Sequence, residues 1–173
     1  MTKEEAAKLF EAQPQKSVLT IDDRACRKTR LVEFFPYLTG AKLPTYATHL
    51  SSGMDLCACL GSGKVKTIYP NQTLIIETGL KCKIHPMMEG QVRSRSGLAI
   101  KNGIIVLNAP GTVDADYEGP LNVILHNVSV DPYVVSHGDR IAQFVICPVH
   151  REEAYMQPEP IKRGEGGFGS TGV

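Results

Sequence analysis

The stretch from Asn108 to Val123 reads N-A-P-G-T-V-D-A-D-Y-E-G-P-L-N-V, and with its flanks it predicts a β-hairpin. An apolar run, Ile104–Leu107, precedes the stretch, and Leu121–Leu125 has an aliphatic residue at every second position. Glycine, proline and aspartate concentrate between the two runs, as expected for a turn-rich loop. Taken alone, the D-x-D-Y of this loop is also explained by aspartates that hydrogen-bond to their own backbone.

Short β-rich runs recur along the chain from residue 41, with Gly, Pro or Asn between them. Many short strands with little helical periodicity favour an all-β sandwich or jelly-roll barrel. We predict a first strand at Leu31–Phe35. The later strands are predicted at Met54–Leu60, Val65–Tyr69, Thr73–Glu77, Leu80–Ile84, Gln91–Arg93, Ile104–Leu107, Leu121–His126, Tyr133–Val135 and Ile141–Val149.

Length and composition limit the possible classes of function. At 173 residues, of which 42% are hydrophobic, the chain can bury one sizeable core. The formal charge is +1 and no basic run or basic-aromatic patch occurs, so we expect no nucleic-acid partner. No apolar run has the length of a membrane span, and the first residues lack the apolar segment of a signal peptide, so we expect no membrane partner.

The five cysteines are scattered and odd in number, which favours reduced thiols and a cytoplasmic location over a disulfide framework. We expect Cys57 and Cys59 to share one face of a strand and to pack in the core. Metal binding by this pair is disfavoured, because no second pair completes a site.

The segment Arg93–Gly103 contains the one short helix that we predict. Ser96 is a plausible N-cap, and Asn102 followed by Gly103 is a plausible stop. A helix start offers free N–H groups and the positive end of a dipole, so with two arginines beside it this segment could bind an anion. A capped helix with surface arginines is the alternative.

The two ends of the chain differ from the middle. Residues 1–30 begin with a capping-box-like T-K-E-E and then become charged and weakly patterned, so we regard them as an appendage of unknown role. From Gly164 the chain is almost entirely small residues, and a glycine-rich segment can wrap a polyphosphate closely. We therefore divide the chain into residues 1–30, a β-barrel domain at 31–160 and a flexible arm at 161–173.

Five blocks of this sequence, in order, resemble the five motifs of the trimeric dUTPases, the deoxyuridine triphosphate nucleotidohydrolases. The L-N-A-P-G-T-V-D run is similar to the bacterial branch of that family. Ser94 departs from the pattern, because a proline is common there. The blocks are S-G-M-D-L-C-A at Ser52–Ala58, R-S-G-L-A at Arg95–Ala99, G-T-V-D-A-D-Y-E-G at Gly111–Gly119, G-D-R-I-A-Q at Gly138–Gln143 and R-G-E-G-G-F-G-S-T-G at Arg163–Gly172.

The resemblance implies a jelly-roll-like distorted β-barrel with one short helix, assembled as a homotrimer whose C-terminal arm reaches a neighbouring subunit. It implies hydrolysis of dUTP to dUMP and diphosphate, which supplies dUMP for dTMP synthesis and keeps uracil out of DNA. Asp114 would be the general base that activates a water for attack on the α-phosphorus. Tyr117 would stack under the deoxyribose and exclude a 2′-hydroxyl.

The other implied residues bind substrate or hold the site together. Asn108 and the main chain of 121–123 would read the uracil, the helix start and Gln143 would bind phosphates, and the arm would close over both. Asp55 would pair with Arg140 at a subunit contact. Mg²⁺ would be held mainly by the phosphates and water, without direct protein ligands. The implied substrate-binding residues are Arg95, Ser96, Gly97, Asn108, Gly111, Tyr117, Leu121, Asn122, Val123, Gln143, Arg163, Phe168, Gly169, Ser170 and Thr171.

Three alternatives remain open at this stage. A dCTP deaminase shares the implied fold, and Glu118 falls where that family has a catalytic glutamate, although Tyr117 and the form of the arm favour a dUTPase. A non-enzymatic protein whose surface dUTP switches is a second alternative. A phosphate-binding module without turnover is the third.

Overall fold

The computed structural model describes residues 30–152, so the appendage and the arm predicted from the sequence lie outside the described range. Within residues 30–152 the chain forms eleven strands and one short helix. The elements are β1 (Val32–Pro36), β2 (Thr45–Tyr46), β3 (Met54–Cys57), β4 (Val65–Ile68), β5 (Thr73–Ile84), β6 (Met88–Arg93), α3 (Ser96–Asn102), β7 (Ile104–Val106), β8 (Gly111–Val113), β9 (Leu121–Asn127), β10 (Tyr133–Ser136) and β11 (Arg140–Pro148).

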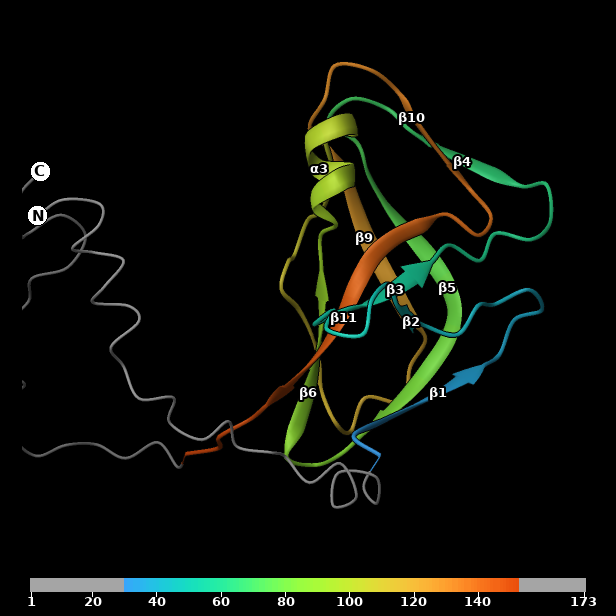
Figure 1. Cartoon of the computed structure of the whole chain (residues 1–173). Helices are drawn as coiled ribbons and strands as arrows, with labels where there is room; N and C mark the ends of the chain where they lie inside the picture. The colour runs from blue at the N-terminus through green and yellow to red at the C-terminus, as the bar shows by residue number, and fades with distance from the viewer. Residues whose placement is uncertain (1–29, 153–173) are drawn as a thin grey trace, which may run out of the picture.

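Two antiparallel sheets enclose the core, and Figure 1 shows them curving around one another. One sheet has the strand order β1-β5-β9-β7, and the other has the order β2-β3-β11-β6-β8. β10 and β4 form a separate two-stranded ribbon, which lies at the same end of the fold as α3. This arrangement confirms the predicted all-β, jelly-roll-like fold with one short helix.

The core lies between the inward faces of the two sheets. Along β9 every second residue is buried, from Leu121 to Asn127, as the aliphatic alternation predicts. Phe144 of β11 is fully buried and meets Phe34 of β1 edge to face, with ring centroids 5.4 Å apart. Gly90 of β6 faces the same ring, and a Cβ there would overlap Phe144. Glycine at position 90 therefore leaves the space that the buried Phe144 ring occupies.

The predicted hairpin forms, but part of its predicted loop is a strand, β8. β7 and β9 pair antiparallel, with Val106 opposite Leu125. Between them, β8 leaves this sheet and pairs with β6 in the other one, with Val113 opposite Gly90. The prediction of a continuous loop is wrong at residues 111–113, because the partner strand of β8 lies about twenty residues earlier in the chain and local sequence does not specify it.

Two predicted strands are one. β5 runs without interruption from Thr73 to Ile84 and pairs with both β1 and β9. The Thr-Gly that suggested a break is a bulge: the register against β9 shifts between Glu77 and Leu80, and Gly79 has a φ of 71°. The bulge bends the strand while pairing continues on both sides.

The helix and the cysteine pair each differ from prediction in one detail. Gly103, in the left-handed conformation, ends α3 as expected. The N-cap is Arg95 rather than Ser96, and its side chain makes no capping hydrogen bond. A guanidinium has only donors and cannot accept a helix N–H; this one donates to Asp55 instead. Cys59 is buried, but β3 ends at Cys57, which is only half-buried, so the two thiols do not share one strand face.

Candidate active site

The hairpin loop, residues 114–120, is held in a compact turn by its own groups. Asp114 follows directly after β8, and its carbonyl oxygen accepts the Tyr117 N–H at 3.2 Å. The Tyr117 hydroxyl donates to the Pro120 carbonyl oxygen at 3.1 Å. The ring lies against Gly119, where a Cβ would overlap the phenol. Glycine at 119 therefore allows the ring to fold back along the loop.

This loop forms one wall of a cleft of about 250 Å³. Asp114 and Tyr117 line one side, and the first residues of β9, Leu121 and Asn122, line another. Asp114 and Tyr117 are both exposed, so a bound molecule can reach them. Three further lining residues have apolar side chains on β8, β5 and β9, namely Val113, Ile75 and Ile124.

Sequence reasoning missed part of this lining. Ile75 and Ile124 are paired across β5 and β9 and lie on the outward face of their sheet, where Ile75 is 57% exposed. An exposed aliphatic pair at outward positions of predicted strands was the signal that could have identified them. Thr112 and Pro120 also line the cleft without having been predicted.

Asn108 and Gly111 lie beside one another. A Cβ at Gly111 would be 2.8 Å from the Asn108 amide nitrogen, so this glycine makes room for the amide side chain. Neither residue lines the cleft, and Val123, also a predicted binding residue, has a fully buried side chain. Any contribution of Val123 to binding would have to come from its backbone.

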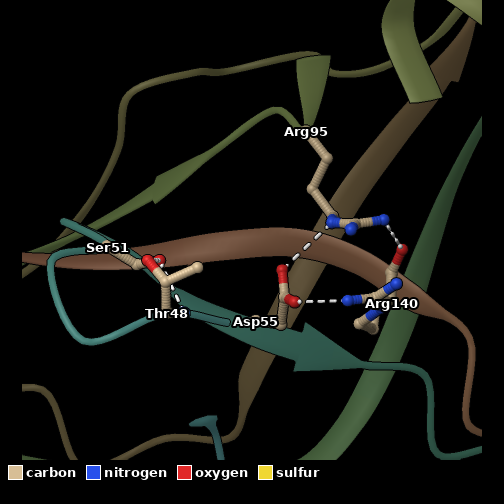
Figure 2. A network of polar contacts seen from close by, with 5 residues as sticks. All are labelled: Thr48, Ser51, Asp55, Arg95 and Arg140. Atoms are coloured by element: carbon tan, nitrogen blue, oxygen red, sulfur yellow. Dashed lines mark hydrogen bonds and ion pairs between the residues drawn. The ribbon is translucent and has the colours of Figure 1, made fainter. Parts of the chain in front are cut away.

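A second group of predicted residues forms what we call the ion-pair cluster: Asp55, Arg95 and Arg140. Asp55 Oδ1 accepts a hydrogen bond from Arg95 Nε at 3.0 Å, and Asp55 Oδ2 accepts one from Arg140 Nη1 at 3.1 Å. Figure 2 shows this carboxylate between the two guanidinium groups. Arg95 Nη1 also donates to the Arg140 carbonyl oxygen at 3.1 Å. The predicted Asp55–Arg140 pair is thus part of a three-residue network.

The elements around the cluster fix its position. Asp55 is buried, at 5% exposure, on β3, and the turn before that strand is closed by Thr48 and Ser51, whose hydroxyl oxygens are 2.8 Å apart (Figure 2). Gln143 of β11 lies opposite Asp55 in one ladder and opposite Arg93 in the other. Gln143 therefore lies between the strands that carry Asp55 and lead to Arg95.

The start of α3 lies beside this cluster. Ser96 and Gly97, the first two helical residues, are exposed, and the space where a Gly97 Cβ would lie is open. Ser94 has a structural role that the sequence did not indicate, since its hydroxyl accepts the Val106 N–H at 2.8 Å. This hydrogen bond joins the end of β6 to β7 and holds the turn that carries Arg95.

The cleft and the ion-pair cluster belong to opposite ends of β6. Val113, just before Asp114, pairs with Gly90 near the beginning of β6, whereas Arg95 follows its end at Arg93. At about 3.3 Å per residue, Gly90 to Arg93 alone spans roughly 10 Å. No residue of the ion-pair cluster lines the cleft among residues 30–152. One described chain thus presents the two groups separately.

A thiol lies next to the cluster. Burial raises the pKa of Cys57, the positive charge of Lys42 opposes this rise, Asp55 adds to it, and the two arginines of the cluster oppose it. Cys57 therefore remains a neutral thiol near pH 7 and adds no negative charge beside the arginines.

Among residues 30–152, no three His, Cys, Asp or Glu side chains are grouped so that they could hold a metal ion. Within the same range, no helix has the length and apolar character needed to cross a membrane. The predicted contacts of Arg163, Phe168, Gly169, Ser170 and Thr171 lie outside the described residues.

Comparison with known proteins identifies related sequences over most of the chain. The model of the dUTPase family matches residues 39–172. A deoxyuridine 5'-triphosphate nucleotidohydrolase from Methylocella silvestris is 43% identical over 144 residues, which cover 82% of this chain and 90% of that protein. A protein of the same name from Anaplasma marginale is 48% identical over 137 residues, which cover 78% of this chain and 91% of that protein.

Solved structures give the same fold. The dUTPase of Staphylococcus bacteriophage 80alpha with dUpNHpp has a TM-score of 0.72 at 24% identity and covers 84% of this chain and 100% of its own. A mutant dUTPase from phage phi11 of S. aureus, described with a structural Mg(II) ion, has a TM-score of 0.68 at 20% identity. The match covers 75% of this chain and 98% of the phage chain. At these identities the likeness concerns the fold.

Proposed function

The chain belongs to the dUTPase family, and from that premise we propose that it hydrolyses dUTP to dUMP and diphosphate by attack of an Asp114-activated water on the α-phosphorus. In the cell this reaction would supply dUMP for dTMP synthesis and keep uracil out of DNA. The observation that carries the proposal is the cleft, which brings an exposed carboxylate, an aromatic ring and the start of β9 together.

Asp114 is the proposed general base. Its carboxylate accepts a proton from a water molecule as that water attacks the α-phosphorus. The bond from the α-phosphorus to the oxygen that bridges to the β-phosphorus breaks, and diphosphate leaves. The position of Asp114 directly after β8 supports this role, because pairing with β6 fixes the backbone immediately before the carboxylate.

Tyr117 is the proposed sugar discriminator. Its hydroxyl is tied to Pro120 and its ring rests on Gly119, so the ring has one defined place in the cleft wall. A flat ring held in this way can stack against a deoxyribose and leave no room for a 2′-hydroxyl. The backbone of residues 121–123 would then face the uracil, as the resemblance implies.

Arg95, Ser96, Gly97 and Gln143 are the proposed phosphate-binding residues. The hydrogen bond from Arg95 Nε to Asp55 orients the Arg95 guanidinium, and this contact favours a fixed cation over a mobile one. Mg²⁺ bound to the phosphates would neutralise their charge. In this proposal the ion is held by phosphates and water, which requires no cluster of protein carboxylates among residues 30–152.

The proposed assembly is a homotrimer in which each site takes residues from more than one chain. The separation of the cleft from the ion-pair cluster along β6 supports this, because a triphosphate whose base lies in the cleft must still meet arginines. In this proposal the arm, residues 161–173, adds Arg163, Phe168, Gly169, Ser170 and Thr171 from a neighbouring subunit.

A nucleotide panel tests the activity. The full chain with Mg²⁺ is incubated separately with dUTP, UTP, dCTP and dTTP, and diphosphate and ammonia are both measured. We expect diphosphate from dUTP and little from the others. Ammonia from dCTP would replace the proposal with a deaminase that uses Glu118, a residue that does not line the cleft. Absence of any product would leave a nucleotide-binding protein without turnover.

A further inference from the structure

Thr78 is a fully buried polar residue in the middle of β5. It lies in the bulge where the pairing with β9 shifts: Glu77 is opposite Asn122, Leu80 is opposite Leu121, and Thr78 and Gly79 are the extra residues between them. Its hydroxyl donates to the Leu121 carbonyl oxygen at 2.5 Å. A side chain thus bonds to the strand β9 at the point where the regular ladder is interrupted.

The bulge itself is fixed from several directions. The Glu77 carbonyl oxygen accepts the Cys59 N–H at 2.7 Å, and the Gly79 carbonyl oxygen accepts the Tyr37 N–H at 2.9 Å. A Cβ at Gly79 would be 2.8 Å from both Cys59 Sγ and the Ala41 Cβ. The Thr78 hydroxyl oxygen therefore belongs to a rigid part of the protein, with little freedom to follow β9 if β9 moves.

The partner of Thr78 lies between two walls of the cleft. Leu121 is the first residue of β9 and lines the cleft. The residue before it, Pro120, accepts the Tyr117 hydroxyl at 3.1 Å, and the residue after it, Asn122, also lines the cleft. Whatever fixes the Leu121 carbonyl therefore fixes the backbone at the junction of the Tyr117 loop and the β9 wall.

We propose that Thr78 is a positioning residue for nucleobase recognition: its buried hydroxyl holds the start of β9 so that the backbone of residues 121–123 presents its polar groups to the base in one place. Thr78 does not line the cleft, so it acts through Leu121. This inference rests on the proposed function, because it concerns how the same cleft selects uracil.

The physical basis is the sensitivity of hydrogen bonding to distance. A site that reads a base edge with backbone groups rejects a wrong base by leaving polar groups unpaired, and this requires that the groups cannot move to accommodate it. If β9 loses its tie to the bulge, uracil loses well-placed partners and cytosine is rejected less strongly. Affinity and base selection then change more than the chemical step does.

The test compares Thr78→Val, which keeps the shape and removes the hydroxyl, with Thr78→Ser, which keeps the hydroxyl and removes a methyl group. Initial rates with dUTP and dCTP give kcat and KM for each. For Thr78→Val we expect the KM for dUTP to rise about tenfold, the preference for dUTP over dCTP to fall about tenfold, and kcat to change less. Thr78→Ser should keep the preference of the wild type.

A control separates positioning from stability. Ser129 follows the other end of β9 by two residues and does not line the cleft. Its hydroxyl lies within hydrogen-bonding distance of Asn127 Oδ1, at 2.7 Å, and of the Asp131 carbonyl oxygen, at 3.0 Å. Ser129→Ala should keep the base preference even if the melting temperature falls. If Thr78→Val does not fold, Thr78→Cys replaces it, because a thiol is a much weaker donor, and its preference should fall below that of Thr78→Ser.

Two results would overturn the inference. One is an unchanged preference and KM in the variant without the hydroxyl, Val or Cys. The other is an equal loss of preference in Thr78→Ser. Wild-type turnover of dUTP is measured first, so a failure of the proposed function appears there, before any variant is compared.

Discussion

Asp55 Oδ1 accepts a 3.0 Å hydrogen bond from Arg95 Nε, while the second oxygen of the same carboxylate holds Arg140 at 3.1 Å. The carboxylate side chain is 6% exposed, whereas those of Arg95 and Arg140 are 23% and 57% exposed. A buried anion thus supports two cations that face outward. Two like charges can remain close at this surface because the carboxylate between them compensates.

Replacing the anion should therefore release both arginines. In Asp55→Asn the amide keeps the size but turns two donors toward a guanidinium, so we expect a loss of about 1–3 kcal/mol in the free energy of unfolding. With Arg95 no longer oriented, the KM for dUTP should rise about tenfold. Urea denaturation and initial rates measure the two effects. Glu33→Gln, in the exposed Arg30–Glu33 pair, is the control and should change neither.

The general base is tested by the pair Asp114→Asn and Asp116→Asn. Both residues are exposed on the same loop, but only Asp114 lines the cleft. Asp114→Asn should keep dUTP binding and lose at least ~100-fold in kcat, because the amide cannot accept the proton. Asp116→Asn should remain within a few-fold of the wild type. Equal losses in both variants would assign the effect to the loop rather than to one carboxylate.

The tyrosine can be divided into its ring and its hydroxyl. Tyr117→Phe removes only the hydrogen bond to Pro120, and an exposed bond of this kind contributes about 1 kcal/mol, so the preference for dUTP over UTP should largely remain. Tyr117→Ala removes the ring and should narrow that preference strongly. Ratios of kcat/KM for the two nucleotides measure it. A Tyr117→Ala variant that still rejects UTP as the wild type does would place the discriminator elsewhere.

Where the local sequence pattern and the tertiary structure agree, the sequence was sufficient to predict the element. The aliphatic alternation in Leu121–Leu125 predicted both β9 and its inward face, and Asn102 followed by Gly103 predicted the end of α3. In both cases the cause is local: a period of two, and a residue that tolerates positive φ.

The sequence was insufficient where a distant partner decides the structure. β8 is a strand only because β6 lies beside it. The helix begins one residue earlier than the sequence predicts, because Arg95, with an extended backbone, is the N-cap and Ser96 is already helical. The cleft lining at Ile75 and Ile124 required the register of β5 against β9. The local sequence around Thr78 does not indicate its role, because its hydroxyl donates to the carbonyl oxygen of Leu121, forty-three residues away.

Alkaline pH should weaken the fold through Cys82. This thiol on β5 is 8% exposed, and burial raises its pKa from 9.0 to about 11. The folded state holds the proton more tightly than the unfolded chain does, so this contribution is fully present below pH 9 and is lost as the pH rises to about 11. Up to about 3 kcal/mol of the free energy of unfolding is involved. Urea titrations across this window should show a flatter decline for Cys82→Val than for the wild type, and parallel declines would contradict the assignment.

The last prediction concerns which chains build one site. Asp114 follows the β8 residue that pairs near the beginning of β6, and Arg95 follows the end of β6. If each site takes its hairpin loop from one subunit and its ion-pair cluster from another, two inactive variants can restore each other. Asp114→Asn damages only the loop side, and Arg95→Gln damages only the phosphate side. In a mixed trimer, some sites then combine an intact loop with an intact cluster.

Random exchange of equal amounts of the two variants should place both intact parts together in about a quarter of the sites, so roughly a quarter of wild-type diphosphate release should return. Each variant taken alone through the same exchange procedure is the control and should stay inactive. Exchange itself is verified by the native mass of trimers that contain one tagged and one untagged variant. Mixed trimers that form but remain inactive would mean that Asp114 and Arg95 of the same chain serve the same site, because then every site carries one defect.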